Sequence, residues 1–137
     1  MAELLSLFMR WLHISSMASL IGGILYARMV AIPADGALAP ELRAALEDRD
    51  AARYRPLVVA AIIGLVLSGV YSVLSTPGHT RRYHVLLGIK LLLAGHVFAS
   101  ALLAARPGNP RRARQLAGAL ISGLAIILIA AYLHRTF

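Results

Sequence analysis

The chain has 137 residues, of which 59% are hydrophobic and 15% are charged, with a formal net charge of +8 and no cysteine. A typical soluble domain is about 45–50% apolar and about 25% charged. The charge content is too low for a disordered tail, and the absence of cysteine excludes a disulfide scaffold or a zinc site with thiolate ligands. The length allows one domain.

Four apolar blocks divide the sequence, and each is long enough to cross about 30 Å of hydrocarbon as a helix. The blocks cover approximately residues 4–32, 56–76, 83–105 and 112–135. The second and fourth blocks have no polar stripe of the kind that a soluble helix turns toward water. The sequence therefore predicts an all-α integral membrane protein, in which one transmembrane domain (1–137) forms an antiparallel four-helix bundle with short Pro/Gly turns.

The connection between the first two blocks is the only sizeable segment expected outside the membrane. Pro40 and Glu41 precede LRAALEDRDAARYR, in which acids and arginines recur at i,i+4 spacing. This pattern predicts a short helix on the cytoplasmic surface that begins at a proline, with Pro56 then opening the second membrane helix.

The basic residues are distributed unequally between the two sides of the predicted bundle. The side that carries segments 34–56 and 106–114 has the larger group: Arg43, Arg49, Arg53, Arg55, Arg106, Arg111, Arg112 and Arg114. The other side has Arg10, Arg81, Arg82 and Arg135. Because positive residues concentrate in cytoplasmic loops, both termini are expected on the non-cytoplasmic side of a bacterial-type inner membrane. The charge indicates topology and lipid contact, so no nucleic-acid partner is expected.

Four ionisable residues fall within the apolar blocks, where a charge or an imidazole is costly: His13, Arg28, Lys90 and His96. Each is therefore a functional candidate. Lys90 has two interpretations, because it lies only about 10 Å from the start of its helix. Its amine can extend to the interface, or it can face the bundle interior and hold a proton or an anionic substrate group.

The first predicted helix gathers polar side chains on the face that carries His13. Met9, Arg10 and Met17 lie within about 60° of His13, and Arg28 returns to the azimuth of Arg10. The two guanidinium groups could pair with the propionates of a porphyrin. The two thioethers and the imidazole could alternatively bind Cu(I), which prefers such soft ligands.

His13 and His96 lie on different helices at depths that differ by about 6 Å. Two imidazoles in this arrangement could bind the two faces of one haem iron inside a bundle. Two alternatives stay open. One histidine alone could act as a ligand or proton carrier, or each could simply form a hydrogen bond to a serine or carbonyl of a neighbouring helix.

Small residues recur at four-residue spacing on several predicted helices. Gly64 and Ser68 form one such pair, and Gly118 and Ser122 form another. In lipid, such positions let helices approach closely. We expect them to mark helix–helix contacts.

Three segments of the chain carry a family resemblance. They are LHISSMASLIGGILYARMVAIPA, RYRPLVVAAIIGLVLSGVY and YHVLLGIKLLLAGHVFAS. They resemble the first three helices of copper-resistance-D (CopD) proteins and of the related HemJ-type protoporphyrinogen oxidases, and the four-helix order is the same. The resemblance implies functional roles for His13, Arg28 and Lys90.

The leading hypothesis is a membrane haem protein that holds b-type haem or a porphyrin between the first and third predicted helices. His13 and His96 would be ligands, Arg10 or Arg28 would bind propionates, and Lys90 and Arg28 would act in catalysis if the protein is an oxidoreductase. Electron transfer or porphyrinogen oxidation would involve a quinone or another membrane redox partner. A CopD-like copper protein is the first alternative. The second is a non-catalytic subunit, in a homo-oligomer or a larger membrane complex.

Overall fold

The structure is a computed structural model that describes residues 1–75, 78 and 80–136. All regular secondary structure in these residues is helical. In chain order the elements are α1 (Ala2–Tyr26), η1 (Ala27–Ala31), α2 (Ile32–Asp35), α3 (Pro40–Ser75), α4 (Arg81–Ala104) and α5 (Arg112–Thr136).

Four helical segments among the described residues are long and apolar enough to cross a membrane: Ala2–Asp35, Pro40–Ser75, Arg81–Ala104 and Arg112–Arg135. Their outer surfaces are strongly apolar. Leu92 is 78% exposed, for example, and Leu128 is 72% exposed. An exposed apolar surface of this extent is unfavourable in water and suits a lipid environment. The structure therefore confirms the prediction of an all-α, four-helix membrane bundle.

The first membrane segment is one uninterrupted helical rod made of α1, η1 and α2. It extends slightly beyond the predicted range of 4–32. The rod changes from α-helical to π-helical hydrogen bonding over Ala27–Ala31. Such wide turns are rare and occur frequently at functional sites. Arg28 lies within this turn.

The segment expected to form a separate surface helix is instead the first part of α3, which runs unbroken from Pro40 to Ser75. Pro56 lies inside this helix and removes the backbone hydrogen bond to the carbonyl of Ala52. Both residues are exposed, so the freed carbonyl remains accessible to other donors. The proline therefore does not end the helix. The prediction of a break at this position was wrong.

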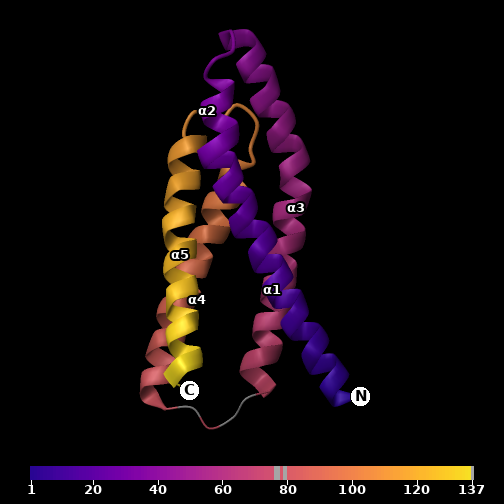
Figure 1. Cartoon of the computed structure of the whole chain (residues 1–137), viewed down its shortest axis with the longest axis vertical. Helices are drawn as coiled ribbons and strands as arrows, with labels where there is room; N and C mark the ends of the chain where they lie inside the picture. Colours follow the sequence, from indigo (N-terminus) through magenta and orange to yellow (C-terminus); the bar gives the residue numbers. More distant parts are fainter. Residues whose placement is uncertain (76–77, 79, 137) are drawn as a thin grey trace.

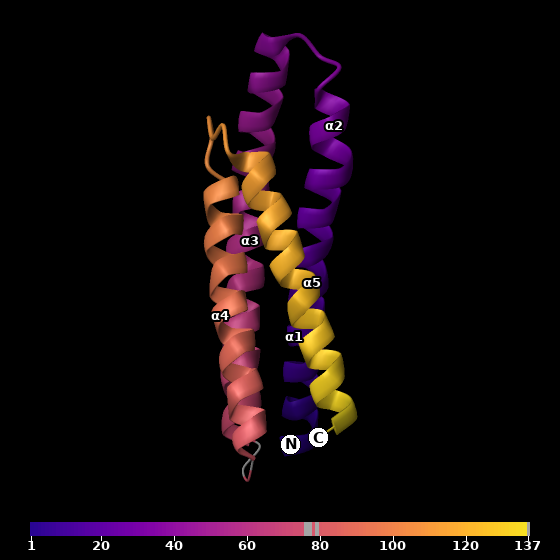
Figure 2. The same cartoon turned by 90° about the vertical axis from the view of Figure 1, so that its left-hand side faces the viewer.

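The helices form two antiparallel pairs (Figures 1 and 2). α1 packs against α3, and α4 packs against α5. Figure 1 shows the two termini at one end and α2 at the other, where α2 and the start of α3 project beyond α4 and α5. At that end the backbone N–H of Gly108 donates to a carboxylate oxygen of Asp48 at 2.8 Å. This bond attaches the α4–α5 connection to α3.

Small residues allow the helices to approach closely, as the spacing predicted. A Cβ atom on Gly64 would collide with the side chain of Ser16, and one on Gly123 would collide with Ile21. The Gly64–Ser16 contact lies between α3 and α1, and the Gly123–Ile21 contact lies between α5 and α1. The buried apolar core lies around these contacts and includes Leu20, Ile24, Val58, Val97, Ala101 and Leu116.

Candidate functional site

His13 is held by a hydrogen-bond chain at the α1–α3 interface. The hydroxyl of the fully buried Ser68 donates to the carbonyl of Gly64 at 2.6 Å, with the Leu65 carbonyl at 3.2 Å. A hydroxyl has a single proton, so its oxygen accepts from Nδ1 of His13, at 2.8 Å. The neutral imidazole then carries its proton on Nδ1. Its Nε2 atom keeps a lone pair that can accept a proton or bind a metal.

Lys90 on α4 lies within electrostatic range of His13. Its side chain is half-buried, and its charge acts electrostatically on His13. This position favours the inward interpretation of Lys90 over extension to the interface. The structure thus brings together an imidazole from α1 and an ammonium group from α4, which were predicted separately as candidates.

His96 belongs to the other helix pair. Its Nδ1 lies 2.8 Å from the hydroxyl oxygen of Ser122 on α5, and its Nε2 lies 3.4 Å from that of Ser100 one turn away on α4. A Cβ on Gly118 would lie 3.5 Å from the ring. Both ring nitrogens of His96 therefore have serine partners. This is the arrangement expected of a histidine that hydrogen-bonds across helices.

The two histidines also lie at different heights. His96 contacts Ser122, which adjoins Gly123, and Ile21 packs on Gly123. Ile21 is eight residues from His13 on α1, which corresponds to about 12 Å at 1.5 Å per residue. The sequence had suggested a difference of about 6 Å. The structure places the two imidazoles in separate helix pairs and does not bring them face to face.

The two arginines of the first segment lie on opposite sides of His13 along the helix. Arg10 is three residues away, is exposed, and lines an open groove with Glu3 and Tyr71. Arg28 is fifteen residues away, or about 22 Å along the rod. It is half-buried, and its Nε has no acceptor among the described residues. Only Arg10 is near the imidazole.

Met9 and Met17 are half-buried, as His13 is, and each lies one turn from it on α1. The predicted Met-His-Met face is therefore present as a stripe on one helix. Among the residues that the structure describes, no group of three or more His, Cys, Asp or Glu side chains gathers in the manner of a metal site.

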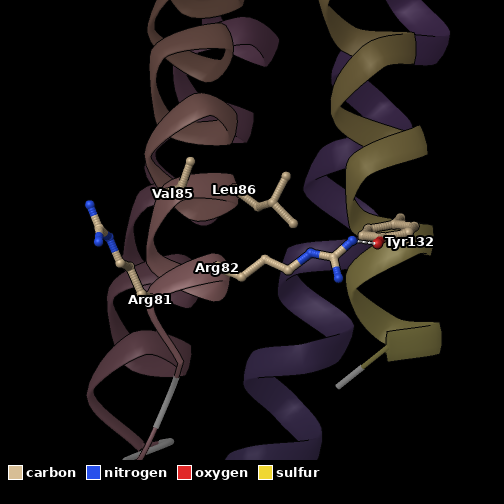
Figure 3. A pocket seen from close by; sticks show the side chains of 5 residues that line it. All are labelled: Arg81, Arg82, Val85, Leu86 and Tyr132. Atoms are coloured by element: carbon tan, nitrogen blue, oxygen red, sulfur yellow. Dashed lines mark hydrogen bonds between the residues drawn. The ribbon is translucent and has the colours of Figure 1, made fainter.

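Sequence reasoning missed how two other basic residues are placed. Arg82 and Arg112 were treated as topology signals. Figure 3 shows Arg82 extending from α4 to the hydroxyl of Tyr132 on α5, whereas Arg81 points away. The guanidinium carbon of Arg82 lies 5.3 Å from the centroid of the Tyr132 ring. Arg112 is buried. No pattern of spacing revealed these positions, because each depends on how the helices are placed relative to one another.

The sequence allowed for a hydrogen bond from each histidine to a serine of a neighbouring helix but did not identify the serines, although their spacing contained a usable signal. Ser68 and Ser122 each follow a glycine by four residues, and in each case the helix that packs against this Gly-xxx-Ser pair supplies the histidine.

Comparisons with protein-family models, with curated proteins and with solved structures return no match for this chain. The chemistry of the site is therefore inferred from its own residues.

Proposed function

We propose that this chain is a multi-pass inner-membrane protein that holds a b-type haem or a porphyrin at His13, for electron transfer or porphyrinogen oxidation. One observation carries the proposal. The hydrogen bond to Ser68 fixes the tautomer of an imidazole in the membrane-spanning part of α1 and leaves its Nε2 atom as a lone-pair donor. A hydrogen bond from the second ring nitrogen is the usual way in which proteins orient a metal-binding histidine. The resemblance to the CopD and HemJ families points to the same residue.

The residues around His13 would supply one protein ligand to the group rather than two. His96, the other candidate, has serine partners at both ring nitrogens and lies about 12 Å away along the bundle axis. We therefore assign His13 alone to the iron. His96 is assigned to holding α4 and α5 together.

Two cations near His13 would bind the propionate groups of the haem or porphyrin. Lys90 is close enough to interact electrostatically with His13, and Arg10 lies one turn away at the edge of a groove. Either can pair with a carboxylate, and Lys90 can also hold or release a proton. When bound, haem would supply one-electron redox chemistry, with a quinone or another membrane redox partner as the electron acceptor. Arg28, in η1, lies too far from His13 along the first membrane segment to share this role.

The direct test is an absorption spectrum of the protein purified in nonionic detergent and incubated with haem, recorded in the oxidised and reduced states. We expect a Soret band that is lost in His13→Ala and retained in the matched control His96→Ala. Lys90→Met should bind haem more weakly while remaining folded. The proposal fails if the wild-type protein shows no Soret band, or if His96→Ala loses the band as completely as His13→Ala does.

A second candidate function is Cu(I) binding of the CopD kind. The observation in its favour is the half-buried stripe of Met9, His13 and Met17 on one face of α1. Copper binding should then fall in both His13→Ala and Met17→Leu. Haem binding, in contrast, should survive the methionine substitution. Competition with a colorimetric Cu(I) chelator measures the affinity, and unchanged affinity in Met17→Leu would exclude the stripe as a copper site.

A further inference from the structure

Arg112 is a buried cation without a complete set of partners. It is the first residue of α5 and is only 8% exposed, whereas its neighbours Arg111 and Arg114 are exposed. Its Nη1 atom is shielded and has no hydrogen-bond acceptor in the described part of the chain. A buried charge whose donors are unmet is strongly destabilising, because removal from water is not compensated. Binding of an anion would therefore stabilise this group.

A second unmet polar group comes from α3. The hydroxyl of Tyr54 is also shielded and has no partner among the described residues. Its ring lies against α1, since a Cβ on Gly23 would be 2.9 Å from its Cε2 atom. The charge of Arg112 acts on this hydroxyl, so the two groups lie within electrostatic range of each other. The α5 guanidinium and the α3 hydroxyl are thus two shielded polar groups without partners among the described residues, within electrostatic range of each other.

The surroundings of this pair favour a negatively charged ligand. Five exposed arginines lie on the adjoining parts of α3, the α4–α5 connection and α5: Arg53, Arg55, Arg106, Arg111 and Arg114. The carboxylate of Asp48 at this end is engaged with the backbone N–H of Gly108. Segments 34–56 and 106–114 together carry eight arginines and five acidic residues, so their net charge is positive. Positive charge concentrated where helices leave the bilayer attracts anionic headgroups.

We propose that Arg112 and Tyr54 form a site for a phosphate-type oxyanion, taken from the headgroup of an anionic phospholipid or from free phosphate. Such an anion offers several acceptor oxygens, which match the planar donor fork of a guanidinium and leave one for the phenol. The site does not depend on the proposed function. Tyr54 contacts α1 at Gly23, ten residues or about 15 Å from His13.

The test uses the full chain in a maltoside detergent, which contains no phosphate. Thermal unfolding is followed while short-chain phosphatidylglycerol is added, or inorganic phosphate in a parallel series. Diacylglycerol and sodium chloride at matched ionic strength serve as blanks. We expect a saturable rise in Tm with at least one of the two probes. A response to the lipid alone assigns the site to a headgroup, and a response to phosphate alone assigns it to the free ion.

Three variants separate binding from structure. Arg112→Gln should raise Tm without ligand, because it removes an uncompensated buried charge, and should weaken the response to the probe about tenfold or more. Tyr54→Phe should weaken the response by a smaller factor. The matched control Arg114→Gln, on the same turn of α5 but exposed, should respond as the wild type does.

Arg112→Lys provides a second check that does not require the protein to fold with glutamine at position 112. This variant keeps the positive charge but loses the planar donor fork of the guanidinium. It should therefore remain folded and bind the probe more weakly. The proposal is overturned if the wild-type protein shows no saturable response to either probe, or if Arg112→Gln or Arg112→Lys responds like the wild type.

Discussion

α1 and α3 approach each other closely at Gly64, and adding one methyl group there gives a quantitative test of the packing. In Gly64→Ala the new Cβ would overlap the hydroxyl of Ser16. It would also lie 3.3 Å from both the Ser16 Cβ and a methyl group of Leu12. The Ser16 hydroxyl and the Leu12 methyl group can rotate, but the Ser16 Cβ is fixed to the backbone of α1, so α1 must move away by a few tenths of an ångström. Overpacking of this kind costs about 1–3 kcal/mol.

The same substitution at Gly69 provides a matched control. Gly69 lies five residues further along α3, and a Cβ there meets nothing within 4 Å. Alanine favours a helix over glycine by up to about 1 kcal/mol, and this propensity gain is common to both sites. The difference in the free energy of unfolding between Gly64→Ala and Gly69→Ala should therefore isolate the steric cost, at about 1–3 kcal/mol.

The assay is reversible unfolding in mixed micelles, followed by far-UV circular dichroism and by the fluorescence of Trp11, the single tryptophan of the chain. The double variant with Ser16→Gly should recover most of the loss, because the space is restored from the other side of the interface. If Gly64→Ala proves as stable as Gly69→Ala, the close α1–α3 contact is not present as described. The hydrogen bond between His13 and Ser68, one turn away, would then lose its structural basis.

Two further predictions concern the site and the topology. Ser68→Ala should destabilise the protein by about 0.6 kcal/mol, the average for a side-chain hydrogen bond inside a membrane, and should release the fixed tautomer of His13. The nitrogen chemical shifts of the imidazole report the tautomer, and unchanged shifts would contradict the assigned donor. Because the chain has no cysteine, single cysteines can report sidedness by labelling in intact cells. Glu3→Cys should react with an impermeant maleimide, whereas Arg106→Cys should react only after permeabilisation; the reverse pattern would invert the proposed topology.

The local sequence determined much of the fold, because a segment that lies in lipid must have an apolar composition that can be recognised without knowledge of its neighbours. Uncharged stretches of about 20 residues must form helices in lipid, where every backbone polar group needs an internal partner. Short Pro/Gly turns then make neighbouring spans antiparallel. The sequence predicts a helix boundary at Pro56, and this prediction is wrong. The exposed position of this proline lets α3 continue through it.

The candidate site was only partly predictable. His13 and Lys90 could be singled out from the sequence, because an imidazole and an ammonium group within apolar blocks are conspicuous. Whether they meet depends on the rotation and height of α1 relative to α4, and periodicity within a single helix does not contain this information. The same limit applies to His96, which the sequence placed about 6 Å from the depth of His13. Its contacts with Ser122 and Ser100 place it in the α4–α5 pair.

The sequence by itself determined that this chain forms four apolar helices and which few ionisable residues lie among them. The tertiary structure decided which of these residues act together. It paired His13 with Ser68, brought it within range of the charge of Lys90, and assigned His96 to the other helix pair. It also buried Arg112 within electrostatic range of Tyr54. The physical reason is that the hydrophobic pattern fixes which segments enter the membrane. Contacts between helices are instead selected by shape at small residues such as Gly64 and Gly123.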